Sequence, residues 1–249
     1  MRYFIELSYN GKHYHGWQNQ PNAITVQEVI EDGLSKLLRI KMSIVGAGRT
    51  DAGVHAKQMF AHFDYEEKID VDHLKFKLNS FLPKDVAIHK IVKVKDNAHA
   101  RFDAVSRTYF YDINLEKDVF NFDNSYYLKH QLNIEKMKEA TQVLFQYKDF
   151  QCFSRSNTDV KTYNCKMMKA EWKLEDSNLR FCIQADRFLR NMVRAIVGTM
   201  IDIGLGKTTI DDFHKIIQSK DRTKAGASAP GHALYLVKVE YPNEIFLNG

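Results

Sequence analysis

Two spacings of hydrophobic residues alternate along the first hundred positions. Every second residue from Tyr3 to Tyr9 is apolar, as in a strand with one buried face. Helical spacing begins after Thr25, where Thr25-Val26-Gln27-Glu28 has the composition of a capping box. The predicted elements are strand 3–9, helix 26–38, strand 40–45, strand 58–65, helix 72–82 and strand 86–94. The order is βαββαβ.

The rest of the chain repeats this order. The predicted elements are strand 106–115, a helix capped by Asn133, strands 166–174 and 179–185, helix 188–203, a short helix 210–219 and strand 234–241. Two βαββαβ units predict an α+β protein of two ferredoxin-like halves, residues 1–103 and 104–249. Because no Pro- or Ser-rich linker separates them, we expect the halves to pack into one body with a central cleft.

Composition narrows the class of protein. The 249 residues are 44% apolar and 27% charged, which is typical of a soluble globular protein. A net charge of +5 is compatible with a polyanionic partner but is too small to establish one. No apolar run is long enough for a membrane span, and the N-terminus lacks a signal-peptide core. Three cysteines without a CxxC pair favour reduced thiols in the cytoplasm.

One glycine-rich segment, Gly46–Ala56, contains the strongest candidate for catalysis. Three of its glycines surround Asp51, and Arg49 stands two residues before that carboxylate. Glycine allows close approach of the main chain to a ligand, so such a loop can present Asp51 at its tip. The alternative from the residues alone is a glycine-rich turn with a solvated aspartate.

A helix predicted over 188–203 adds a candidate cation. Arg187, Arg190, Asn191 and Arg194 are spaced to form one polar stripe, and the turn after Arg194 is apolar. A desolvated guanidinium needs an anion, so Arg194 is expected to bind a carboxylate such as Asp51 or a phosphate. A salt bridge or a solvated surface is the simpler interpretation for the two earlier arginines.

The strand predicted over 106–115 has aromatic side chains on both faces. We expect Phe110 to face the core. Tyr109 and Tyr111 share the opposite face, where a ring could stack on an unpaired base. Positive residues of the second half form a plausible phosphate-tracking surface: Lys166, Lys169, Lys173, Lys220, Arg222 and Lys224.

Two other sites are excluded by spacing. The cysteines lack the ligand spacing of a zinc site, so no metal is expected. Gly204–Thr208 imitates the end of a phosphate loop but follows a helix, so we interpret it as a helix C-terminus.

Several blocks together resemble the tRNA pseudouridine synthase A family. They occur in family order and cover nearly the whole chain: Tyr9-Asn10-Gly11 with Gly16–Gln20, Gly46–Ala56, Phe102–Ile113, Phe188–Gly198, and Arg222–Gly226 leading into Tyr235–Val237. Two positions depart from the family pattern. Arg187 stands where the family often has glycine, and Ala233 stands where it usually has glycine.

The resemblance implies an activity and a set of residue roles. Asp51 is implied as the nucleophile, Arg49 as its neighbour in the active-site loop, Tyr109 as the residue against the target uridine, and Arg194 as the partner of Asp51. Such enzymes convert uridine to pseudouridine in the anticodon stem and loop of tRNA, at tRNA positions 38, 39 and 40. They use no cofactor or metal and act as homodimers.

Two other classes of protein remain alternatives. One is an RNA-binding module without catalysis, because ferredoxin-like halves are common RNA platforms. The other is a carboxylate-based glycosidase, which needs a second catalytic carboxylate. The sequence also leaves open whether Asp51 attacks C1′ or C6 of the nucleotide or helps to remove the 2′ proton.

Overall fold

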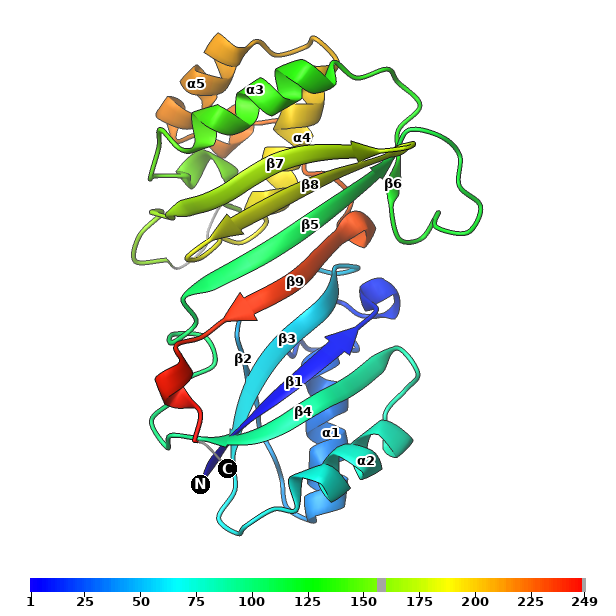
Figure 1. Ribbon diagram of the computed structural model, residues 1–249, viewed down its shortest axis with the longest axis vertical. Helices are drawn as coiled ribbons and strands as arrows, with labels where there is room; N and C mark the ends of the chain where they lie inside the picture. Colours follow the sequence, from blue (N-terminus) through cyan, green and yellow to red (C-terminus); the bar gives the residue numbers. More distant parts are fainter. Residues whose placement is uncertain (156–159, 248–249) are drawn as a thin grey trace. The chain divides into compact units, whose positions relative to one another are not determined.

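The computed structural model describes residues 1–155 and 160–247, and these form two compact units (Figure 1). The first unit comprises Met1–Ser106 with Tyr235–Gly249, and the second comprises Arg107–Leu234. The last strand, which the sequence analysis grouped with the second half, clusters with the first unit.

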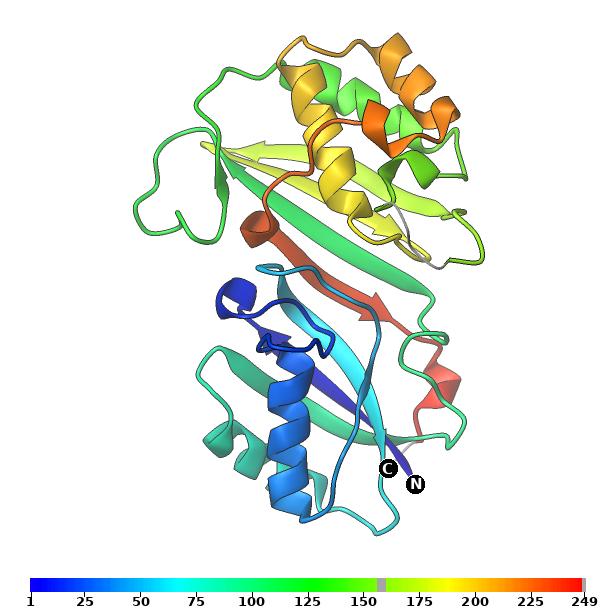
Figure 2. The same ribbon diagram turned by 180° about the vertical axis from the view of Figure 1, so that it is seen from behind.

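The first unit is a mixed sheet with helices on one face. Its strands follow the order β4 (Val86–Val94), β1 (Arg2–Tyr9), β3 (His55–Asp64) and β9 (Leu234–Glu240). Strand β1 is antiparallel to both neighbours, whereas β9 is parallel to β3. Helices α1 (Val26–Leu38) and α2 (Val71–Phe81) lie on the same side of this sheet (Figure 2). Ile5, Leu7 and Ile30 are completely buried between the layers.

Local signals explain where α1 begins and why the predicted strand over 40–45 is almost absent. Thr25 accepts a hydrogen bond from the Glu28 amide, which confirms the predicted cap. Only Val45–Gly46 forms a strand, β2. The preceding amides instead donate to side chains of α1: Met42 N to Ser35 Oγ (2.8 Å) and Ile44 N to Glu31 Oε1 (2.9 Å). Met42 and Ile44 are therefore buried without a strand partner.

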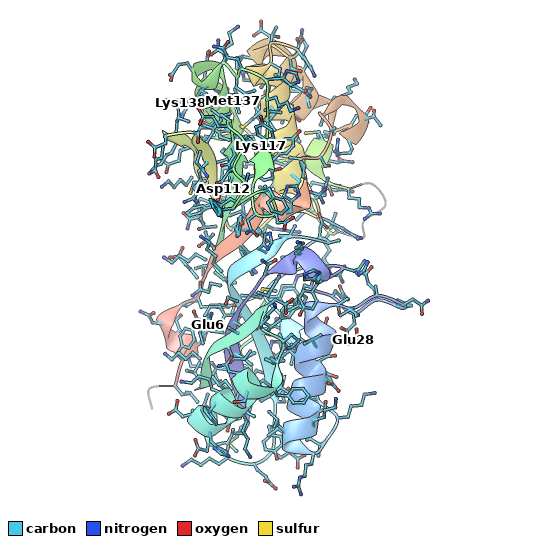
Figure 3. All side chains as sticks on the ribbon, turned by 90° about the vertical axis from the view of Figure 1, so that its right-hand side faces the viewer. Glu6, Glu28, Asp112, Lys117, Met137 and Lys138 are labelled. Atoms are coloured by element: carbon cyan, nitrogen blue, oxygen red, sulfur yellow. The ribbon has the colours of Figure 1, made fainter. Side chains whose placement is uncertain are left out.

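Polar side chains tie the strands of the first unit together. Glu6 on β1, labelled in Figure 3, accepts a hydrogen bond from Gln58 on β3 (2.8 Å). Gln58 in turn accepts one from the Val239 amide on β9 (3.0 Å).

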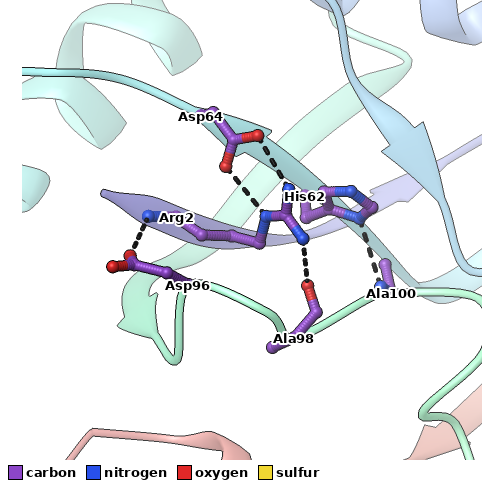
Figure 4. Close-up of polar contacts among 6 residues, drawn as sticks. All are labelled: Arg2, His62, Asp64, Asp96, Ala98 and Ala100. Atoms are coloured by element: carbon purple, nitrogen blue, oxygen red, sulfur yellow. Dashed lines mark hydrogen bonds and ion pairs between the residues drawn. The ribbon is translucent and has the colours of Figure 1, made fainter.

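A second group of polar side chains lies where β1 begins and β3 ends. Arg2 makes two 2.8 Å bonds to Asp64, and the neighbouring His62 accepts from the Ala100 amide at 3.1 Å (Figure 4). Burial, and then the charge of Arg2, lower the pKa of His62 to about 4, so this imidazole is neutral in the folded protein.

The second unit has a smaller sheet under three helices. Strand β8 (Asn178–Ala185) pairs antiparallel with both β5 (Ser106–Asn114) and β7 (Met167–Glu175), and β6 (Tyr126–Tyr127) adds a short parallel pair to β5. The helices are α3 (Ile134–Leu144), α4 (Met192–Gly204) and α5 (Ile210–Ser219). Helix α4 lies against the sheet (Figure 2), and eleven of its residues are buried.

The start of α4 corrects the prediction of a helix from residue 188. Asn191 has a left-handed backbone (φ 66°), and the Met192 amide closes a turn onto the Leu189 carbonyl. Arg187 and Arg190 therefore precede the helix, and the predicted polar stripe does not lie on one helical face. Phe188 and Leu189 are apolar and extended the helical pattern of the sequence towards the N-terminus, although both residues precede the helix. The other end is confirmed as a helix C-terminus, because α4 ends at Gly204 and Gly206 has φ 72°.

The fold is therefore α+β, with a mixed sheet and five α-helices in the described part of the chain. Among residues 1–155 and 160–247, no helix has the length and apolar character needed to cross a bilayer.

Candidate active site

Asp51 lies in a loop between β2 and β3 that is fixed at both ends. The Ala47 amide donates to the Phe60 carbonyl (2.7 Å), and the Val54 amide donates to the Asp51 carbonyl (3.2 Å), which makes a tight turn around the carboxylate. Asp51 is half-buried and Arg49 is exposed. Thr50, between them, is only 9% exposed.

Residues 9–17, here called the opening segment, pack against this loop on the Thr50 side. The hydroxyls of Tyr9 and Thr50 are hydrogen-bonded at 2.9 Å, and the Trp17 amide donates to the Thr50 carbonyl at 3.2 Å. Gly16 has φ 92°, and a Cβ there would lie 2.4 Å from the same carbonyl oxygen. Thr50 is thus held through its side chain and its main chain.

The opening segment also contacts the loop on the far side of Asp51. The Gly53 amide donates to the Tyr14 carbonyl (3.3 Å). A Cβ at Gly11 would lie 2.0 Å from the Val54 carbonyl oxygen, so only glycine fits there. The Gly11 amide donates to His55 Nδ1 (3.0 Å), and the ring of His55 stacks on Tyr235 at 4.7 Å.

These contacts revise the role that the sequence analysis gave to the loop glycines. A Cβ at Gly46 would meet the ring of Trp17 at 2.5 Å, so this glycine accommodates protein rather than ligand. Gly48 is different, because a Cβ there would meet nothing within 4 Å. Of these two, only Gly48 borders open space.

Strand β5 places its aromatic residues differently from the prediction. Tyr109 is half-buried, and its ring meets the ring of Phe188 edge-on at 5.2 Å. Tyr111 is completely buried and donates to the Pro230 carbonyl (3.0 Å), so the proposal that its ring faces a base is wrong. Burial raises the pKa of the Tyr111 phenol far above its usual value.

Phe110, predicted to be core, is half-buried under a charged pair. The guanidinium of Arg180 lies 5.0 Å from the centre of its ring. Arg180 also makes bonds of 2.6 and 2.9 Å to the two oxygens of Asp112, which is labelled in Figure 3. A cation over an aromatic face and a bidentate carboxylate pair replace the apolar neighbours that the sequence suggested.

Arg194 lies in the first turn of α4, beside residues 225–230, here called the strap. Its Nε donates to the Ala229 carbonyl (2.7 Å), and the Ala229 amide donates back to the Arg194 carbonyl (3.0 Å). The strap lies so close to α4 that a Cβ at Gly198 would be 1.7 Å from the Ala227 carbonyl oxygen. Helix and strap therefore position the Arg194 guanidinium together.

Some of the predicted phosphate-binding cations have structural partners. Arg222 donates to Ser228 (2.8 Å) and to the Gly226 carbonyl (3.1 Å), and thus holds the strap. Lys169 and Lys173 share Glu171, and Lys220 pairs with Asp149 at 2.8 Å.

Metal ligands and thiols are the remaining candidates for chemistry. Over residues 1–155 and 160–247, no three His, Cys, Asp or Glu side chains are placed to hold a metal ion. The three cysteines are buried and free, and burial raises the pKa of both Cys152 and Cys165 to about 12. Neither of these two thiols is therefore an effective nucleophile at neutral pH.

The four predicted site residues are divided between the units. Asp51 and Arg49 belong to the first unit, whereas Tyr109 and Arg194 belong to the second. Sequence reasoning missed Tyr9 and His55 as neighbours of the Asp51 loop. The only sequence signal for Tyr9 was its place in the block Tyr9-Asn10-Gly11.

Comparison with known proteins identifies the class. A family model described as tRNA pseudouridine synthase matches residues 7–103 and 140–242. Proteins named tRNA pseudouridine synthase A from Bacteroides fragilis and Parabacteroides distasonis are 57% and 58% identical to this chain, each match covering 98% of both chains. One from Bacillus subtilis is 38% identical over 98% of this chain and all of its own. The chain belongs to the tRNA pseudouridine synthase family.

Proposed function

We propose that this protein isomerises uridine to pseudouridine in the anticodon stem and loop of tRNA, with Asp51 as the nucleophile. The observation that carries the proposal is the half-buried carboxylate of Asp51, in a loop whose neighbouring residues are fixed by hydrogen bonds, in a chain that belongs to this family. Tight control of a reacting group is what covalent catalysis requires.

The remaining site residues have roles that follow from the family resemblance. In this proposal Arg49 borders the reacting nucleotide, Tyr109 lies against the target uracil, and Arg194 is the partner of the Asp51 carboxylate. The same proposal includes two ferredoxin-like halves, one carrying the Asp51 loop and the other carrying Tyr109 and Arg194. The βαββαβ order of the first unit is compatible with it.

The chemistry explains why these residue types are needed. The bond between N1 of uracil and C1′ of ribose breaks, the base rotates, and a bond forms between C5 and C1′. The C5 proton is lost and N1 ends with a proton, so no external reactant is consumed. A base inside a helical stem must first leave the stack. An aromatic ring such as Tyr109 can hold the freed base, and an arginine can keep a carboxylate ionised and oriented.

We also propose that the protein acts as a homodimer, as the resemblance implies. Three apolar side chains of the second unit are exposed close together in the sequence, which supports a contact surface for a second copy of the chain. Val119, Phe120 and Phe122, in the connection between β5 and β6, are 62%, 90% and 64% exposed. Exposed aromatic residues this close together mark interaction surfaces more often than isolated ones do. Sedimentation of the wild type and of Phe120→Ser with Phe122→Ser should show a dimer and a weakened dimer, respectively.

An RNA-binding module without catalysis is the alternative, and one experiment separates the two. Wild type and Asp51→Asn are incubated with unmodified tRNA, and pseudouridine is mapped at nucleotide resolution. The amide keeps the shape of the side chain but is a poor nucleophile, so turnover should be lost while folding and tRNA affinity remain. A catalytically silent wild type that binds tRNA would favour the alternative.

A matched control is available in another loop. Asp176 is exposed and has φ 54°, a backbone conformation that asparagine adopts as readily as aspartate. Asp176→Asn should therefore fold, bind and react like the wild type. If Asp51→Asn reacted within tenfold of the wild-type rate, Asp51 would not be the nucleophile.

A further inference from the structure

The Asp51 loop is attached to the opening segment at two separate places, one on either side of the carboxylate. On the Thr50 side, the contacts are the hydroxyl pair with Tyr9 and the Trp17 amide on the Thr50 carbonyl. On the Val54 side, they are the Gly53 amide on the Tyr14 carbonyl and the close packing of Gly11 on the Val54 carbonyl. Asp51 and Ala52 therefore bridge two fixed points.

The pair of hydroxyls differs from the other contacts because it joins two side chains. Tyr9 is 4% exposed and ends strand β1, and its ring packs 6.2 Å from the ring of Trp17. The sheet therefore fixes the ring of Tyr9, and the hydrogen bond between the two hydroxyls fixes the side chain of Thr50. A hydrogen bond of this kind, shielded from water, stabilises one loop conformation against others.

From this geometry we infer that Tyr9 and Thr50 are positioning residues for catalysis: their hydroxyl–hydroxyl bond holds the Asp51 loop in its reactive conformation. The inference rests on the proposed role of Asp51. Neither hydroxyl touches the nucleotide in this account, so the bond acts on the rate of reaction rather than on the affinity for RNA. A displacement of the nucleophile by a fraction of an ångström is enough to slow attack.

The test combines two measurements on the full-length protein. The first is the rate of pseudouridine formation in tRNA, separated into kcat and KM, for Tyr9→Phe, Thr50→Val and the double variant. Each single variant should lower kcat about fivefold to tenfold with KM within about twofold of wild type. Because both substitutions remove the same bond, the double variant should be no slower than the slower single variant. Thr50→Ser, which keeps a hydroxyl, should recover most of the rate.

The second measurement needs no activity. Hydrogen exchange at the Gly53 and Val54 amides should become about fivefold to tenfold faster in Tyr9→Phe, because the loop opens more often. Tyr3→Phe is the matched control: Tyr3 is also a buried tyrosine of β1, but its hydroxyl accepts from the Ile69 amide (3.3 Å), away from the loop. It should change neither kcat nor exchange at these two amides.

Each outcome decides one question. Unchanged exchange at both amides in Tyr9→Phe would overturn the inference, as would kcat falls that multiply in the double variant. Faster exchange with an unchanged kcat would also overturn it, because the bond would then order the loop without serving the reaction. A wild type that forms no pseudouridine in any tRNA would reject the proposed function instead, and exchange alone would then show whether the bond orders the loop.

Discussion

Replacing Gly198 with alanine should detach the strap from α4. The new Cβ would lie 1.7 Å from the carbonyl oxygen and 2.9 Å from the carbonyl carbon of Ala227. Contacts of a real Cβ below 3.0 Å are essentially never seen, so the strap has to move by at least about 1.3 Å. The obstacle is main chain on both sides, which no rotation of a side chain can relieve.

Three hydrogen bonds set the size of the effect. Two of them join Arg194 and Ala229, at 2.7 and 3.0 Å. The third joins the Gly226 amide to Thr199 Oγ1 at 2.9 Å. At about 1 kcal/mol each, their loss lowers the free energy of unfolding by about 3 kcal/mol. Alanine in place of glycine inside a helix raises the free energy of unfolding by up to about 1 kcal/mol, so the net loss of stability is about 2 kcal/mol.

Urea denaturation of Gly198→Ala measures this loss, and a second helical glycine gives the control. A Cβ at Gly33 in α1 would meet only side-chain ends, at 3.3 and 3.4 Å, so Gly33→Ala should be neutral or slightly stabilising. In the same preparations, single-turnover pseudouridine formation should fall in Gly198→Ala alone, because Arg194 loses the carbonyl that orients its guanidinium.

A Gly198→Ala protein that is as stable as wild type to within about 0.5 kcal/mol, and whose Ala229 amide is still protected from hydrogen exchange, would contradict this prediction. Such a protein would show that the strap can reach the same position without close contact to α4.

Four further outcomes are expected. Lowering the pH from 6.5 towards 4 should destabilise the wild type more than His62→Gln, by a difference of at most about 3 kcal/mol in urea titrations, because the unfolded chain binds a proton that the folded His62 excludes. Tyr109→Ala should lose the stacking of the ring on the base, which contributes about 1–3 kcal/mol of interaction free energy, and Tyr109→Phe should lose less. Full single-turnover activity in the alanine variant would place this ring outside the pocket. Arg194→Met should lower the single-turnover rate, and Arg194→Lys should recover part of it, because an ammonium lacks the planar fork with which a guanidinium holds both oxygens of a carboxylate; a full rate in Arg194→Met would separate Arg194 from Asp51. The affinity for tRNA should fall steeply with salt in binding titrations. A single-stranded uridine oligomer should react more slowly than a folded anticodon arm, and equal turnover of the two would contradict recognition of the folded RNA.

Short-range signals in the sequence were sufficient for most elements. The cap at Thr25 and the cap at Asn133 each concern residues three positions apart, and both are present as predicted. The alternation from Tyr3 to Tyr9 likewise gave β1, because one face of that strand is buried along its whole length. The position of Asp51 between two strands also follows from local glycine content and the flanking apolar residues.

Contacts between distant segments decided the rest. Ile40, Met42 and Ile44 alternate with polar residues as in a strand, but the amides of Met42 and Ile44 donate to side chains of α1. Tyr111 and Phe110 have aromatic rings on opposite faces of β5, and only the packing of the strap and Arg180 determines which of them is buried. Periodicity reports which face of an element is apolar, but it does not report what lies against that face.

The candidate site divides in the same way. The sequence by itself determined that the chain has an Arg-Thr-Asp loop, a tyrosine strand and an arginine near the start of an apolar helix. Only the tertiary structure placed Gly11 and Gly16 against the main chain of that loop and joined Tyr9 to Thr50 across 41 positions of sequence. The reason is physical: a hydrogen bond or a close approach depends on where two backbones meet in space, and residues so far apart in sequence meet only after the sheet has formed.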